Sequence, residues 1–263
     1  MDLKLSGKTA LVTGSTAGIG LAISKRLAEE GAEVVIVGRS ADKLAQAAKE
    51  LQGIAAARVR AVVADVATAG GAELLYSQAP EIDILVNNLG IYESKEFENI
   101  TDEDWRRFFE VNVLSGARLS RMYFPAMLKR NWGRVIFVAS ESGVLVPPDM
   151  IHYGMTKTAQ LSISRGLAAL TKGTNVTVNS VLPGTTRSEG IEEFLKSVAS
   201  DPHAPAADIE AEFFAKDRPT SLIQRMIEAD EIATLVTYLA SPLSAATNGA
   251  ALRVDGGITP TII

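Results

Sequence analysis

Short apolar runs alternate with longer segments of helical periodicity along the chain, and this alternation restricts the fold more than any other feature. The apolar runs are rich in Val and Ile and are bounded by Gly, Asn or Asp, which predicts buried strands. They are Thr9–Thr13, Glu33–Val37, Val59–Ala64, Ile82–Val86, Arg134–Ala139, Asn175–Val181 and Ala250–Val254.

The segments between these runs show the spacing of amphipathic helices. They are Gly18–Glu30, Ala41–Leu51, Ala67–Gln78, Asp102–Lys129, His152–Leu170 and Ala229–Leu239. Such alternation predicts βαβ units, and therefore an α/β, doubly wound fold with a seven-stranded parallel sheet and helices on both faces. No repeat or linker interrupts the 263 residues, so we expect a single domain over 1–263.

One region, 185–225, departs from this rhythm. It is charged, it contains Pro202, Pro205 and Pro219, and it carries short helical patterns at Ile191–Val198 and Ala207–Lys216. It lies between the sixth and seventh predicted strands. Ligands of doubly wound sheets bind at the carboxyl ends of strands, so we interpret it as a substrate lid. The alternative is a surface excursion that only packs.

Composition excludes several classes of function. The net charge of −5 argues against nucleic-acid binding. The absence of cysteine excludes disulfides and thiolate metal sites and permits the cytoplasm, where we expect the protein. Two isolated histidines do not predict a zinc site. Neither a signal peptide nor a membrane span is recognisable.

The first strand runs directly into T-G-S-T-A-G-I-G, residues 13–20. Gly14, Gly18 and Gly20 would allow a tight turn and close packing of strand and helix, and would bring backbone N–H groups near a phosphate. Ser15, Thr16 and Ile19 complete this turn. The helix that follows would place its N-terminus toward a pyrophosphate. The alternative is a glycine-rich turn without a ligand.

The second strand is followed by Gly38 and Arg39. An acidic residue at Gly38 would bind the ribose 2′-hydroxyl of NAD, whereas a guanidinium suits the 2′-phosphate of NADP. Arg39 therefore predicts NADP(H) over NAD(H), the alternative being a solvent-exposed arginine.

Tyr153 and Lys157 lie four residues apart in a predicted helix, so both side chains share one face. A neighbouring ammonium favours the phenolate and would lower the pKa of the tyrosine from its usual value near 10. The pair is a candidate proton-transfer device, although the same spacing also occurs in ordinary polar helix faces.

These segments together resemble the short-chain dehydrogenase/reductases, in particular the compact 3-oxoacyl-carrier-protein reductases and sugar-alcohol dehydrogenases. The resemblance extends from Gly7 to Gly257 and keeps the family's order and spacing. It rests on Thr13–Gly20, Asp65-Val66, Asn87–Gly90, Asn112, Ser140, Tyr153 with Lys157, and Pro183-Gly184.

The resemblance implies a Rossmann fold and a role for each matched residue. Tyr153 would be the general acid and base, and Lys157 would bind the nicotinamide ribose. Ser140 would bind the substrate oxygen, and Asn112 would hold a water of a proton relay. The cofactor would also contact Tyr153 itself and Asp65, Val66, Asn88, Gly90, Pro183, Gly184, Thr186 and Ser188.

The sequence departs from the family pattern at Leu89, where alanine is usual, and at Ser188, where threonine is usual. Leu89 would either narrow the cofactor site or point into the core. Within enzymes, the alternatives are an NAD-dependent alcohol or sugar-alcohol dehydrogenase and a sugar epimerase or dehydratase. A non-catalytic NADP-sensing protein is the alternative of another class. The small-molecule carbonyl or alcohol substrate is not identifiable from the sequence.

Several further residues carry weaker signals. Glu141 would contact substrate or stay at the surface. Arg187 would bind an anionic substrate or pair with Glu189 or another lid acid. His152 is expected to be structural. The aromatic residues Trp105, Phe108, Phe109 and Trp132 are expected to pack between subunits. The two long helices would form the interface of a homodimer or homotetramer, as the resemblance implies.

Overall fold

The computed structural model describes residues 2–54, 57–188, 191, 195–196 and 199–262. The strands within this part form one sheet. They are β1 (Thr9–Val12), β2 (Glu33–Gly38), β3 (Arg58–Val63), β4 (Ile84–Asn87), β5 (Gly133–Val138), β6 (Val176–Pro183) and β7 (Ala251–Val254). Every neighbouring pair is parallel, in the order β3-β2-β1-β4-β5-β6-β7. The predicted seven-stranded parallel sheet is confirmed.

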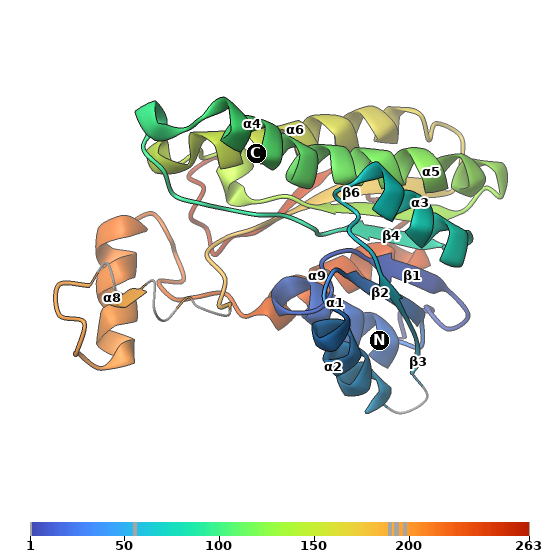
Figure 1. Cartoon of the computed structure of the whole chain (residues 1–263), viewed down its shortest axis with the longest axis horizontal. Helices are drawn as coiled ribbons and strands as arrows, with labels where there is room; N and C mark the ends of the chain where they lie inside the picture. The colour runs from blue at the N-terminus through green and yellow to red at the C-terminus, as the bar shows by residue number, and fades with distance from the viewer. Residues whose placement is uncertain (1, 55–56, 189–190, 192–194, 197–198, 263) are drawn as a thin grey trace.

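Helices cover both faces of the sheet (Figure 1). They are α1 (Gly18–Glu29), α2 (Ala41–Gln52), α3 (Ala69–Gln78), α4 (Asp102–Phe109), α5 (Ser115–Lys129), α6 (Ile151–Ala169), α8 (Ala206–Asp217) and α9 (Ala229–Ala240). Helices α1, α2 and α9 lie on one face, and α3 to α6 lie on the other (Figure 1). No helix in the described ranges is long and apolar enough to cross a membrane.

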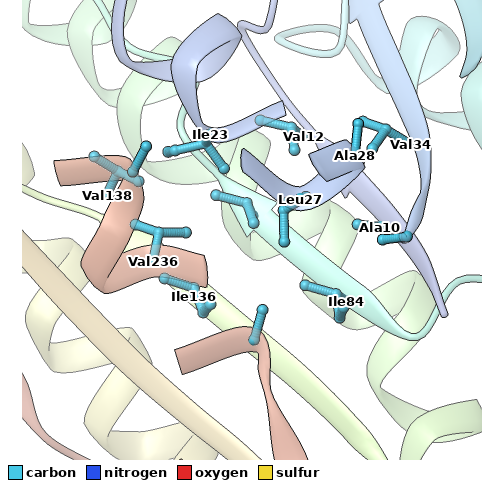
Figure 2. Close-up of a cluster of buried hydrophobic side chains, with 14 of the residues drawn as sticks. Ala10, Val12, Ile23, Leu27, Ala28, Val34, Ile84, Ile136, Val138 and Val236 are labelled. Carbon is cyan, nitrogen blue, oxygen red and sulfur yellow. The ribbon is translucent and has the colours of Figure 1, made fainter. Parts of the chain in front are cut away.

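Each face of the sheet has its own apolar core. On the first face, Ile23 and Leu27 of α1 and Val236 of α9 pack onto Val12 and Ile136 of the sheet (Figure 2). On the second face, Leu119 and Phe137 belong to a cluster between the sheet and helices α3 and α5. These two layers fix the strands, and therefore the residues that follow the strand ends.

The prediction of buried strands is wrong for the two edges of the sheet. Strand β3 is mostly exposed, and β7 alternates between exposed and half-buried residues. Each edge strand has a strand neighbour on one side only. On β7, Leu252 and Val254 pack toward the first core, while Ala251 and Arg253 are exposed.

The segment predicted as a helix over Asp102–Lys129 is helical throughout, but it is not α-helical along its whole length. Residues Glu110–Leu114 form a π-helical segment between α4 and α5. Such segments are uncommon and often lie at functional sites. This one contains Asn112, which is fully buried.

The region predicted as a lid includes α8, which stands apart from the helix layers (Figure 1). Ile209, Phe213 and Phe214 of α8 form a small apolar cluster with Leu195 and Met226. The helix predicted at Ile191–Val198 lies largely outside the described residues. Helix α8 therefore packs in a small apolar cluster of its own, which is separate from the two cores of the sheet.

Candidate functional site

The predicted site residues lie just beyond the carboxyl ends of the strands, on one side of the sheet. Thr13 and Gly14 follow β1, and Asn88 follows β4. Ser140 follows β5 after one residue, and Gly184 follows β6 directly. Because β1 and β4 are adjacent while the chain order reverses between them, this side contains the switch point at which doubly wound proteins bind ligands.

Tyr153 and Lys157 lie on the first two turns of α6 and face one another as predicted. The Lys157 Nζ atom lies 5.5 Å from the centre of the Tyr153 ring and donates a hydrogen bond to the Val138 carbonyl at 3.1 Å. A hydrogen bond with the Ser140 hydroxyl lowers the pKa of Tyr153. Burial raises that pKa by more. The structure thus brings Ser140, Tyr153 and Lys157 together.

The predicted lowering of the Tyr153 pKa is not found in the structure. Burial raises the pKa of Tyr153, and the charge of Glu141 raises it further. Burial also lowers the pKa of Lys157 to about 8. Desolvation disfavours the charged form of both groups. Tyr153 therefore holds its proton, as a proton donor must.

Asn112 is held rigidly beside Lys157. Its side-chain amide donates to the Ile91 carbonyl at 2.9 Å and to the Thr156 hydroxyl at 3.0 Å, and it accepts from the Ile91 N–H at 2.8 Å. Its backbone carbonyl accepts from the Gln160 side chain. These bonds fix the position of the Asn112 side chain. Its predicted relay role stays a prediction.

Gly90 leaves the approach to these groups open. A Cβ atom at Gly90 would lie 3.4 Å from Asn112 Oδ1 and 3.5 Å from Lys157 Nζ. A side chain longer than a methyl group would therefore cover both polar atoms. Leu89, by contrast, packs against the second core of the sheet, so its side chain does not narrow this approach.

The glycine turn has the backbone expected of a phosphate-binding loop. Gly14 and Gly18 have φ values of 61° and 52°, in the left-handed region that favours glycine. Helix α1 begins after Ala17, and no side chain caps its first N–H groups. Uncapped N–H groups at a helix N-terminus attract anions. The turn therefore fits a pyrophosphate.

Two side chains near the turn have structural partners. The Ser15 hydroxyl accepts from the Val37 N–H at 2.9 Å and is fully buried, so only the Ser15 backbone can reach a phosphate. Asn88 donates to the carbonyls of Thr13 and Gly14, at 2.9 and 3.2 Å. Asn88 thus fixes the shape of the glycine turn.

Arg39 and Asp65 face each other beyond the ends of β2 and β3. The Arg39 side chain is 78% exposed, and its Nη1 atom lies 4.0 Å from Asp65 Oδ2. An exposed ion pair separated by 4.0 Å contributes little to stability. The Arg39 guanidinium is therefore available to bind another anion. Val66 is buried in the second core, and only its backbone can contact a ligand.

The predicted nicotinamide contacts lie after β6. Pro183 ends β6 beside Val254, and the Gly184 N–H donates to the Val254 carbonyl. A Cβ atom at Gly184 would lie 2.8 Å from the Asp255 carbonyl oxygen, so the two segments touch through backbone. The Thr186 hydroxyl donates back to the Gly184 carbonyl, and Ser188 is half-buried.

Arg187 forms ion pairs instead of facing the site as a free cation. Its guanidinium bonds Glu210 of α8 and Glu228 before α9, each at 2.9 Å. The alternative of a pair with another lid acid is therefore the one that the structure shows. Glu189 lies outside the described residues. Arg187 ties α8 to the segment that precedes α9.

The aromatic residues predicted to pack between subunits mostly pack within the chain. Phe108 is fully buried against His152, with ring centres 4.2 Å apart, and Trp105 approaches His152 edge-on. Trp132 is flanked by Lys8 and Arg134. Phe109 alone among these four is exposed, at 40%. His152 is buried, as its predicted structural role requires.

The sequence predicts that Glu141 contacts substrate or stays at the surface, and it does not identify a partner for this residue. Its carboxyl oxygen Oε2 lies 2.6 Å from Ser140 Oγ. Adjacency to Ser140 in the sequence was the only signal, since neighbouring residues usually point apart. Over the described ranges, no three His, Asp or Glu side chains gather to hold a metal.

The comparisons with known proteins agree with this geometry. The family model described as short chain dehydrogenase matches residues 8–198. The chain is 52% identical over 263 residues to the uncharacterized oxidoreductase YvaG of Bacillus subtilis, covering 100% of both. It is 32% identical over 259 residues to D-beta-hydroxybutyrate dehydrogenase of Cupriavidus necator, covering 96% of this chain and 98% of that one.

Among solved structures, the chain is similar to L-sorbose reductase from Gluconobacter frateurii, complexed with NADPH and L-sorbose. The TM-score is 0.91 at 33% identity, and the match covers 100% of both chains. The family match, the relatives and the sheet order agree: this chain belongs to the short-chain dehydrogenase/reductase family of oxidoreductases.

Proposed function

We propose that the protein is an NADP(H)-dependent oxidoreductase that interconverts a carbonyl compound and a secondary alcohol. The observation that carries the proposal is the grouping of Ser140, Tyr153 and Lys157 at the strand end next to Gly90. A hydroxyl, a protonated phenol and a buried ammonium at one place can bind and protonate a single oxygen atom.

The cofactor would lie along the strand ends. The backbone of residues 14–20, including Ser15, Thr16 and Ile19, would bind its pyrophosphate. Asp65 and the Val66 backbone would hold the adenine, and Gly90 would give access to Lys157. Pro183, Gly184, Thr186 and Ser188 would contact the nicotinamide amide. When bound, the nicotinamide supplies or accepts the hydride.

The protein's own residues perform the acid–base half of the reaction. Tyr153 would donate its proton to the carbonyl oxygen in reduction and accept it back in oxidation. Lys157, whose pKa of about 8 allows both charge states near neutrality, would restore the tyrosine's proton. Asn112 would hold a water that links Lys157 to solvent as a proton relay.

The preference for NADP(H) would come from Arg39. A charge-assisted bond to a 2′-phosphate contributes about 1.5–3 kcal/mol, which corresponds to a change of about 10-fold or more in affinity. We expect Arg39→Ala to lose at least that much NADPH affinity and to keep its NADH affinity. Fluorescence titration with each cofactor measures both.

The matched control for this titration is Arg58→Ala. Arg58 is also exposed, but it stands at the opposite end of β3 from Asp65. This variant should bind both cofactors as the unmodified protein does. NADH binding more tightly than NADPH, or an unchanged preference in Arg39→Ala, would contradict the assignment and favour the NAD-dependent alternative.

Only the names of the relatives point to a substrate class. One is named for D-beta-hydroxybutyrate, and one structure contains L-sorbose. Both compounds carry hydroxyl and carbonyl chemistry on a small polar skeleton, so a panel built on them is the first to assay. We propose that 185–225 covers this substrate as a lid, anchored by Arg187.

We also propose one catalytic domain per chain and a homodimer or homotetramer. The outer faces of α4, α5 and α6 would form the interface, where Phe109 is exposed. Light scattering at micromolar protein concentration tests this assembly, and a monomer would contradict it.

A further inference from the structure

Glu141 places a carboxyl group directly against the hydroxyl that is proposed to bind the substrate oxygen. Ser140 is extended, with φ of −172° and ψ of 157°, and Glu141 begins a short 3-10 turn over Glu141–Gly143. This backbone places Ser140 Oγ 2.6 Å from Glu141 Oε2, where the serine hydroxyl donates to the carboxyl group when that group is ionised. The Ser142 N–H also donates to Ser140 Oγ, at 3.1 Å.

The bonding capacity of Ser140 makes the charge of Glu141 decisive. A serine hydroxyl has one hydrogen to donate and two lone pairs. If Glu141 is ionised, it accepts that hydrogen, and Ser140 presents only a lone pair to a substrate oxygen. If Glu141 is protonated, Glu141 and Ser142 occupy both lone pairs of Ser140 Oγ. The Ser140 hydrogen is then free to be donated.

We propose that Glu141 is a positioning residue that works in its protonated form, donating to Ser140 Oγ and thereby directing the Ser140 hydrogen to the substrate oxygen. This inference rests on the proposed function and adds a residue to it. Ser140 keeps its own proton throughout, and the proton transferred to the substrate comes from Tyr153. Successive donation polarises each hydroxyl and strengthens the last bond.

The surroundings of Glu141 favour the protonated form. Burial raises the pKa of the Glu141 carboxyl, while the Ser140 bond and the charge of Arg218, which follows α8, oppose that rise. Tyr153 and Lys157 face Glu141 from α6, and Glu141 raises the pKa of both only when it is ionised. Strand β6, which also packs against this turn, carries no charged residue.

Two variants separate the hydrogen bond from the charge. Glu141→Gln cannot ionise and keeps a donor of the same length. Glu141→Asn cannot ionise either, but its side chain is one carbon shorter and does not reach Ser140. Both variants therefore change the electrostatic environment of Tyr153 and Lys157 alike, and they differ only in the donated bond.

The kinetic test follows NADPH oxidation with 2,3-butanedione, a carbonyl probe without hydroxyl groups, across the neutral and alkaline range. We expect the wild-type kcat to fall as pH rises through the Glu141 pKa. Glu141→Gln should lose this fall and exceed the wild type in alkali. Glu141→Asn should be several-fold slower than Glu141→Gln. Equal rates in the two variants, or a wild-type rate that rises as Glu141 ionises, would overturn the inference.

A spectroscopic test does not depend on turnover. Difference infrared spectroscopy against pH should show a protonated carboxyl band in the wild type at neutral pH that both variants lack. Absence of this band from the wild type would overturn the inference. Failure of the proposed function would appear differently, as a wild-type protein that oxidises NADPH with none of the carbonyl probes.

Discussion

Replacing Tyr153 with phenylalanine should lower kcat by about 10²–10⁴, the usual contribution of a general acid. The affinity for NADPH should stay the same, because the phenylalanine ring keeps the packing of Tyr153 on α6. Stopped-flow measurement of NADPH oxidation, together with a cofactor titration, separates the two quantities. The expected result is an enzyme that binds its cofactor and does not turn over.

The geometry of the site explains why this loss should be large. Burial keeps Tyr153 protonated, and Ser140 already serves to bind the same oxygen. Lys157 donates to the Val138 carbonyl, and its Nζ atom lies 5.5 Å from the centre of the Tyr153 ring. Among these groups, the tyrosine hydroxyl is the one placed to protonate the substrate.

Tyr92→Phe is the matched control for this prediction. The Tyr92 ring meets the Tyr153 ring edge-on, with centres 6.5 Å apart, and the residue is 66% exposed. Removing its hydroxyl should leave kcat within a few-fold of the wild type. A Tyr153→Phe enzyme that retains comparable activity would refute the assignment of the general acid.

The second large effect is expected from Gly20→Ala. A Cβ atom at Gly20 would lie 2.2 Å from the Gly14 carbonyl oxygen and 2.6 Å from Asn88 Nδ2. The backbone of the glycine turn must move to admit it, and overpacking of this kind costs about 1–3 kcal/mol of stability. NADPH affinity should fall more than tenfold, because the displaced turn is the proposed pyrophosphate site.

Gly166→Ala provides the comparison for this substitution. Gly166 is exposed on α6, and a Cβ atom there would meet nothing within 4 Å. The free energy of unfolding of this variant should rise by about 0.4–1 kcal/mol, so it should unfold at a higher temperature. Its affinity for the cofactor should not change. Thermal unfolding and NADPH titration of both variants decide the matter. Normal binding by Gly20→Ala would show that the turn does not hold the cofactor.

The sheet was predictable because a buried parallel strand has a recognisable sequence pattern. Runs such as Glu33–Val37 are apolar on both faces and end at Gly, Asn or Asp, and the structure confirms their order and direction. The edge strands were misjudged for the same reason. Val and Ile mark a strand whether or not a second neighbour or a helix covers it.

The site was predictable in its members and less so in its electrostatics. The spacing of Tyr153 and Lys157 placed them on one helix face, but spacing does not report desolvation, which raises the pKa of the tyrosine here. The π-helical segment around Asn112 has no signature in a 3.6-residue period. The ion pairs of Arg187 and the contact of Glu141 depend on how loops fold back, which local sequence does not determine.

The central claim is that this chain transfers hydride between a nicotinamide and a carbonyl carbon. The most direct test supplies NADPH deuterated at the transferable C4 position, with L-sorbose and with the keto form of β-hydroxybutyrate as acceptors. The account predicts oxidised cofactor and a product alcohol that carries the deuterium on its hydroxyl-bearing carbon. Cofactor oxidation without deuterium in the product, or no oxidation with any carbonyl compound, would contradict it.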